Sequence, residues 1–256
     1  MLTNPIINEQ NFRFNCRTKF YLDHNGTKVP YQVMCFSAPI FNPFYSSDNL
    51  DRYDEVSEKK HREIFPDENK KRALRRAKSR VFDLMINNVA DCNLFVTLTV
   101  DKEKIDRYDY SKIMKELNVF LGNKVQKNGL KYVLIPEYHK DGAIHFHGIF
   151  NRYKGIDLID SGKKKNGKKI YNIGSYKFGF TTAQKISGKD SIVKVSKYVY
   201  KYMSKSASLD MIGGRYFLHG GALNEAVVEY SDTDFSTFPG SEFEITDTMR
   251  CKIISI

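Results

Sequence analysis

Short runs of alternating apolar and polar residues in the middle of the chain predict a β-sheet. These runs cover residues 93–100, 131–138, 143–150 and about 177–186. A period of two is typical of strands that bury one face. The turn signal Lys140-Asp141-Gly142 lies between the second and third runs, so these two runs are expected to pair as an antiparallel hairpin.

Longer stretches with helical periodicity lie before, between and after these strands. They cover residues from about 67 to 87, about 110 to 126 and about 188 to 205. In each stretch, apolar residues recur every three or four positions, as they do on one face of an amphipathic helix. The order of strand, helix, hairpin, strand and helix predicts an α+β fold, in which an antiparallel sheet has flanking helices.

The segments outside this core are expected to be less regular. Residues 1–88 are interpreted as an N-terminal extension that contains the first helix and short strands near 17–21 and 31–36. The core itself is expected over residues 89–222. Residues 223–256 carry seven Asp and Glu against two basic residues. They are interpreted as an acidic C-terminal extension that either packs on the basic helix or is only partly ordered.

The charge of the chain favours a polyanionic partner. There are 41 Lys and Arg against 30 Asp and Glu, which gives a net charge of +11. Between Lys59 and Arg80 there are ten basic and three acidic residues, mostly on the first predicted helix. This helix either neutralises phosphates, with a strong dependence on salt, or is a solvated basic surface. A second basic run, residues 162–169 in a polar insertion over 151–175, lacks the final Ser or Thr of a phosphate-binding loop and is interpreted as a mobile loop.

Cysteine usage and hydropathy indicate the compartment. The four cysteines have neither metal-ligand spacing nor the pattern of a disulfide framework, which is consistent with a reducing environment. The N-terminus lacks the charged and apolar regions of a signal peptide, and no apolar run approaches the length of a membrane span. We therefore expect a soluble cytoplasmic protein without a membrane partner.

Two histidines two residues apart form the most informative pattern in the sequence. His145 and His147 project from one face of a predicted strand, and the hairpin brings Glu137 back beside them. Two imidazoles and a carboxylate on one face predict a three-ligand site for a divalent metal, with open coordination positions. Imidazole suits Zn, Fe and Mn, while Mg prefers oxygen, so the ligand set does not identify the metal. The alternative for any single histidine is a structural role, and His139 is expected to be exposed beside the turn.

The last predicted helix carries tyrosines and lysines at helical spacing. Tyr198 and Tyr202 are one turn apart on one face, with Lys201 and Lys205 close to them, whereas Tyr200 points to the opposite side. A tyrosine hydroxyl has a pKa of about 10 and is a poor nucleophile unless its electrophile is polarised. A metal on a phosphate supplies that polarisation and a lysine balances charge, so these tyrosines are candidate nucleophiles that form a phosphotyrosine. The alternative is that the rings cover the edge of a core stripe.

Three stretches together resemble the HUH endonucleases, which initiate rolling-circle replication in phages and plasmids. Residues 93–99 resemble the first motif of that superfamily, and residues 145–147 resemble its histidine motif. Residues 198–205 are similar to the two-tyrosine motif of initiators from single-stranded DNA phages. Glu137 stands where several members of the superfamily have a third metal ligand. The motifs occur in the order typical of the superfamily.

This resemblance implies a fold, a cofactor and a reaction. The fold would be the HUH α+β core, and the cofactor Mg²⁺ or Mn²⁺. The enzyme would nick one strand of single-stranded or cruciform origin DNA and join to the 5′ phosphate through Tyr198 or Tyr202. The freed 3′ hydroxyl would serve a polymerase, with a host helicase and polymerase as further partners in a bacterial cell.

Three alternatives stay open at this point. A relaxase or single-strand transposase of the same superfamily uses similar residues, although two tyrosines favour replication because the second allows a second cleavage. A non-enzymatic origin-binding protein would need the basic helix but not the tyrosines or ligands. An iron oxygenase with two histidines and a carboxylate, or a zinc hydrolase, would leave the Tyr and Lys helix and the net charge unexplained. No pattern indicates an oligomeric state or an origin sequence.

Overall fold

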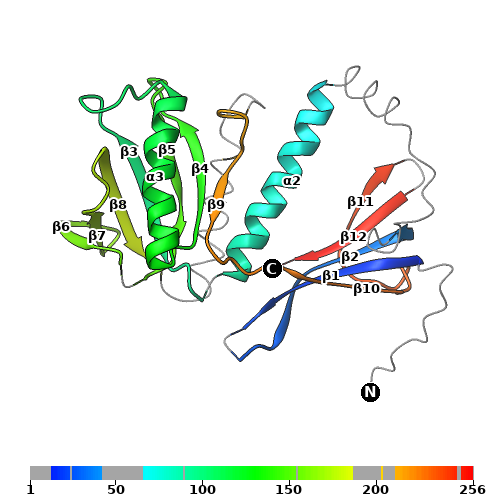
Figure 1. Cartoon of the computed structure of the whole chain (residues 1–256). Helices are drawn as coiled ribbons and strands as arrows, with labels where there is room; N and C mark the ends of the chain where they lie inside the picture. The colour runs from blue at the N-terminus through cyan, green and yellow to red at the C-terminus, as the bar shows by residue number, and fades with distance from the viewer. Residues whose placement is uncertain are drawn as a thin grey trace. The chain divides into compact units, whose positions relative to one another are not determined.

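The structure is a computed structural model whose chain divides into two compact units. It describes residues 13–23, 25–41, 66–88, 90–153, 155–186, 203, 211–246 and 249–255. The terminal unit combines residues 1–61 with residues 226–256, and the central unit comprises residues 62–225 (Figure 1). The two ends of the chain therefore fold together, and the helix expected in an N-terminal extension belongs to the central unit.

Five antiparallel strands form the sheet of the terminal unit, in the order β10-β1-β2-β12-β11. They are β1 (Arg13–Leu22), β2 (Lys28–Phe41), β10 (Val227–Ser231), β11 (Ser241–Thr246) and β12 (Met249–Ser255). The short strands expected near 17–21 and 31–36 are parts of longer ones. The described part of the acidic C-terminal segment pairs within this sheet, which corrects the expectation of a partly ordered tail or one packed on the basic helix. Ladder hydrogen bonds use the backbone, so a low apolar content does not prevent them.

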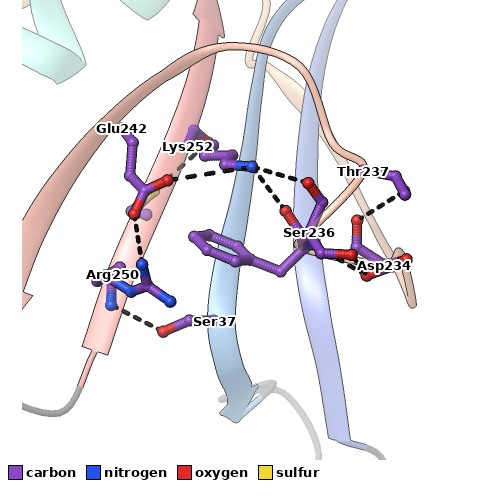
Figure 2. A network of polar contacts seen from close by, with 9 residues as sticks. Ser37, Asp234, Ser236, Thr237, Glu242, Arg250 and Lys252 are labelled. Atoms are coloured by element: carbon purple, nitrogen blue, oxygen red, sulfur yellow. Dashed lines mark hydrogen bonds and ion pairs between the residues drawn. The ribbon is translucent and has the colours of Figure 1, made fainter.

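A polar network holds the loop between β10 and β11 against this sheet, as Figure 2 shows. Nζ of Lys252 donates hydrogen bonds to the backbone carbonyl oxygens of Phe235 and Ser236, at 2.9 and 3.2 Å. The guanidinium of Arg250 forms an ion pair with Glu242 at 2.9 Å. Both cations also lie over the ring of Phe235. Side chains of β12 therefore fix the position of a loop that has no regular secondary structure of its own.

Seven antiparallel strands form the sheet of the central unit, in the order β6-β7-β8-β3-β5-β4-β9. They are β3 (Leu94–Val100), β4 (Tyr132–Tyr138), β5 (Ile144–Phe150), β6 (Leu158–Lys165), β7 (Lys168–Ile173), β8 (Gly179–Lys185) and β9 (Leu218–Gly220). The four strands predicted from alternation are all present within a few residues of their expected bounds. This sheet and its helices confirm the α+β class with an antiparallel sheet and flanking helices.

The polar insertion of the central unit is a two-stranded ribbon. β6 and β7 are joined by Asn166 and Gly167, whose φ angles of 51° and 75° fit a type I′ turn. This corrects the expectation of a mobile loop over residues 162–169. Side chains on both faces of the tip are exposed, so no alternation of apolar and polar residues marked the strands.

Two long helices of the central unit occur where periodicity predicts them, α2 (Pro66–Asn87) and α3 (Tyr110–Asn128). α3 begins after Asp109, whose carboxylate accepts a hydrogen bond from the backbone N–H of Lys112. It ends at Gly129, whose φ of 69° allows the left-handed conformation of a C-terminal cap. Local capping signals therefore set both ends of α3.

The third predicted helix, over residues from about 188 to 205, lies outside the described part of the chain except for Met203. Met203 is helical and buried. No helix in the described part is long and apolar enough to cross a membrane.

The helix α3 covers one face of the central sheet. Alternate side chains of β3, from Leu94 to Val100, are buried on this face. The core beneath α3 also contains Ile113, Leu117, Leu121, Leu134, Phe146 and Phe150. Burying each of these large apolar side chains contributes roughly 1.5–3 kcal/mol, so this core holds the central strands in one register.

The helix α2 covers part of the opposite face. Its apolar stripe packs on β4 and β5 through Val81, Leu84 and Met85 on the helix and Val133, Ile135 and Ile149 on the sheet. An ion pair between Arg80 and Glu225 adds a second attachment. The part of the basic run that precedes residue 66 lies outside the described residues. The basic helix is thus a structural element of the central unit.

A close backbone approach at Gly148 sets the spacing between β5 and β4. A Cβ atom at this position would lie 1.9 Å from the carbonyl oxygen of Val133. We therefore predict that Gly148→Ala lowers the free energy of unfolding by about 2 kcal/mol, because the ladder has to distort to make room. Gly122→Ala on α3 is the matched control, since a Cβ there meets nothing within 4 Å and should stabilise the helix by about 0.5–1 kcal/mol. Urea denaturation measures both values, and equal effects would contradict the close approach.

Candidate active site

Strand register brings the predicted ligands together in rows that cross the central sheet. In one row, Thr99 of β3 is opposite His145 of β5, which is opposite Glu137 of β4. In the next row, Thr97 is opposite His147. Residues opposite one another in a ladder project from the same face, so all five side chains share one face. The hairpin thus places Glu137 beside the two histidines.

The face that carries these rows has an apolar end and a polar end. One row beyond His147, the side chains of Phe95, Ile149 and Val133 pack in the cluster that includes α2. The histidine rows are half-buried and follow directly on that cluster. The candidate site therefore lies at the border of a packed core, which restrains the strands that carry it.

Glu137 and His147 are in direct contact. Oε2 of Glu137 lies 3.1 Å from Nε2 of His147, and the two side chains are 21% and 14% exposed. Polar interactions in such a partly desolvated place are stronger than in water. The carboxylate therefore holds this imidazole in place from one side.

Two threonines hold the histidines from the other side. Oγ1 of Thr97 lies 3.1 Å from Nδ1 of His147, and Oγ1 of Thr99 lies 3.2 Å from Nδ1 of His145. When a histidine binds a ligand through Nε2, its Nδ1–H donates to such an oxygen, which fixes the tautomer and the ring orientation. Sequence reasoning gave these threonines no role. Their signal was a period of two that matches the histidine pair, but only the register shows which residues meet.

His139 lies beside His145, a contact that sequence reasoning did not predict. It is exposed, as expected, yet its ring stacks on that of His145 with centroids 5.0 Å apart, and Nδ1 of His139 lies 3.2 Å from Asp141. Burial lowers the pKa of His145, as do the neighbouring His139 and Arg107, while Asp141 acts in the opposite direction. His145 is therefore neutral near pH 7 and keeps a nitrogen lone pair for a ligand.

The donor atoms suit a divalent transition metal in kind, but the side chains do not converge on one point. The rings of His145 and His147 are inclined by 12°, with centroids 6.5 Å apart. With metal–nitrogen bonds of about 2.1 Å, two imidazoles at a right angle around one ion would have centroids roughly 4.5 Å apart. Among the described residues, no three His, Cys, Asp or Glu side chains are grouped to hold a metal ion. Joint coordination by these histidines and Glu137 requires a side-chain rotation, and their role as ligands stays a prediction.

The predicted nucleophiles lie outside the described residues. This holds for Tyr198 and Tyr202, and equally for Lys201 and Lys205. Met203, which adjoins this set, is buried in the apolar cluster that α2 forms on the histidine-bearing face. The segment with the tyrosine and lysine pattern is therefore anchored on the same face of the sheet as the histidines, by one described residue.

Basic side chains of α2 add positive charge to the central unit. Lys71, Arg75 and Arg76 are exposed and form no ion pair within the described part of the chain. Two other basic residues of the helix, Arg72 and Arg80, are paired with acids. Three unpaired cations on one exposed helix are suited to phosphate groups.

The comparisons with known proteins give one match. The model of a family of replication-associated proteins, described by the name ORF2, matches residues 93–207, a little under half of the chain. The matched stretch contains the β3 threonines, both histidines and the tyrosine pattern at residues 198–205. No curated protein and no solved structure matches the chain. The match indicates a role in the initiation of replication.

The threonine contacts give a prediction about metal affinity. Thr97→Val with Thr99→Val removes both hydroxyl groups with little change of shape. We predict a drop of about 10–100-fold in Mn²⁺ affinity, because the rings lose the partners that orient them. Isothermal titration measures the affinity. Thr182→Val is the matched control, since Thr182 is opposite Thr97 on β8 and shows no hydrogen bond to a described histidine. Unchanged affinity in the double variant would contradict the orienting role.

Proposed function

We propose that the protein is a replication initiator that nicks one DNA strand at an origin by tyrosine attack. The observation that carries this proposal is the placement of Glu137, His145 and His147 on one face of the sheet. Met203 supports it, because it attaches the tyrosine-containing segment to that same face. The match to the replication-associated family supports replication as the setting.

The reaction begins with the hydroxyl group of Tyr198 or Tyr202. Its oxygen forms a bond to phosphorus while the bond from phosphorus to the 3′ oxygen of the preceding nucleotide breaks. The hydroxyl proton passes to a base, and the leaving 3′ oxygen takes up a proton. The products are a 5′-phosphotyrosine and a free 3′ hydroxyl. Because the number of phosphoester bonds is unchanged, the nick can be resealed, and a second tyrosine allows a second cleavage.

The other residues of the site bind and orient the scissile phosphate. A Mg²⁺ or Mn²⁺ ion bound by the three predicted ligands would polarise the phosphate. Thr97 and Thr99 keep the two imidazoles in a fixed orientation. Lys201 and Lys205 balance the charge that develops on the phosphate oxygens during attack.

The partner that we propose is single-stranded or cruciform origin DNA. The net charge of +11 and the unpaired cations of α2 support this choice. The freed 3′ hydroxyl is the substrate of a polymerase, so a host polymerase and helicase are further partners. These partners place the protein in the cytoplasm of a bacterial host cell.

A tyrosine double variant tests the mechanism. Tyr198→Phe with Tyr202→Phe should eliminate the covalent adduct, because both hydroxyl groups are lost while the ring volumes hardly change. The measurement is a denaturing gel of protein incubated with Mn²⁺ and a random pool of single-stranded DNA, followed by peptide mass mapping. We expect Tyr198 to carry the first adduct.

Tyr200→Phe is the matched control for this experiment. It makes the same change in the same segment, on the opposite side of the predicted helix, and should leave the adduct intact. DNA attached to Tyr200, or an adduct that survives in the double variant, would contradict the mechanism. A protein that binds the DNA but forms no adduct in any variant would instead be a non-enzymatic origin-binding protein.

Salt dependence tests the contribution of α2. Lys71→Gln with Arg75→Gln should reduce the slope of log affinity against log salt by about 1.4, at about 0.7 for each lost phosphate contact with a single strand. Lys115→Gln with Lys127→Gln is the control, because these exposed lysines lie on α3, which covers the opposite face of the sheet. Fluorescence anisotropy over a salt series measures both slopes. The same slope for both double variants would show that α2 is a solvated surface.

A further inference from the structure

The row that contains His145 continues onto a fourth strand. Phe180 of β8 is opposite Thr99 of β3, which is opposite His145, which in turn is opposite Glu137. Residues opposite one another in a ladder share a face, and the next residue on β8, Thr181, is buried on the other face. The ring of Phe180 therefore projects from the candidate active-site face, two strands away from His145.

Phe180 is the most exposed large hydrophobic side chain in the described part of the chain. Its exposed fraction is 66%. Thr99 and Thr182, its neighbours on this face, are polar, so the exposed apolar surface is one ring and not a patch. A contiguous apolar patch is the usual sign of a protein-docking surface, and it is missing around this residue. A single flat ring in polar surroundings fits a flat ligand of similar size.

The backbone on both sides holds this ring in a defined place. A Cβ atom at Gly179 would lie 1.8 Å from the carbonyl oxygen of Thr99, so β8 approaches β3 very closely at this point. On the other side of Gly179, Phe178 turns into the core and packs against Tyr176 and Phe120. A ring carried by a strand on a packed core loses little freedom when a ligand stacks on it.

We propose that Phe180 is a stacking platform for an unpaired base of the single-stranded DNA that the histidine rows hold. The inference rests on the proposed function, because that function places DNA at His145. Strands two apart in a sheet are separated by about 10 Å. That distance corresponds to no more than about three nucleotides of a stacked strand, at about 3.4 Å each. The stacked base therefore lies within a few nucleotides of the scissile phosphate and helps to set which phosphate reaches the tyrosines.

Removal of the ring tests the platform. Phe180→Leu keeps an apolar side chain and should weaken the binding of oligo(dT) to the full chain roughly five-fold or more, as expected for a lost stack of a base on an aromatic ring. The loss should be equal at low and high salt, because stacking releases no counterions. An abasic oligonucleotide of the same length should bind the variant and the unchanged chain alike. Phe243→Leu, at an exposed position on β11 in the terminal unit, is the matched control and should have no effect.

A fluorescence experiment tests the contact directly. The chain contains no tryptophan, so Phe180→Trp introduces a single reporter at the proposed platform. Oligo(dT) should quench its emission, whereas the abasic oligonucleotide should leave it unchanged. Phe243→Trp places the same reporter in the terminal unit and should not be quenched by either oligonucleotide.

Each contrary result overturns the platform. These results are an unchanged oligo(dT) affinity in Phe180→Leu, a loss of affinity that appears as a changed salt slope, an unquenched Phe180→Trp variant, or no binding of oligo(dT) by the unchanged chain. Failure of the proposed function is a separate outcome, namely the absence of a covalent adduct. Both Phe180 variants keep the tyrosines and the predicted ligands, so adduct formation is measured on the same preparations.

Discussion

The pairing register of β3, β5 and β4 is the constraint on which the candidate site depends. A shift of one residue in any of these strands would turn all of its side chains to the opposite face. The register is enforced from the other side of the sheet, where Leu94, Val96 and Leu98 are completely buried under α3. Exposing each of them would cost roughly 1.5–3 kcal/mol. The polar rows are therefore positioned by an apolar core that they do not touch.

The histidine-bearing face combines stability with chemistry by dividing itself along the strands. At one end it is apolar and packs with α2 and Met203, and at the other end it is polar and open. The contact of Glu137 with His147 lies where these ends meet. This arrangement explains why one helix can have two roles. The apolar stripe of α2 fixes the strands, while its outer side presents cations close to the core that supports the site.

Local patterns predicted the central unit, and long-range pairing hid the rest. The hairpin with Glu137 and both histidines could be predicted because alternation and a turn signal lie within one short stretch, and α3 because its stripe and caps are local. The terminal sheet could not, since its strands pair across most of the chain and bury isolated residues such as Cys35 and Cys251. The ribbon of β6 and β7 was missed because both faces of its tip are exposed.

The same distinction separates the predicted ligands from the residues that sequence reasoning missed. Spacing alone puts His145 and His147 on one face, but the partners Thr97, Thr99 and Phe180 come from strands that are not neighbours of β5 in the sequence. Their roles follow only from the order β8-β3-β5-β4. That order also divides the forces on a bound strand. Cations on α2 act at a distance and are weakened by salt, whereas a ring at the end of the histidine row acts only on a base in contact with it. Charge can then supply affinity for any single strand, while the ring and the histidine row, held on the same ladder, define the position of the phosphate between them.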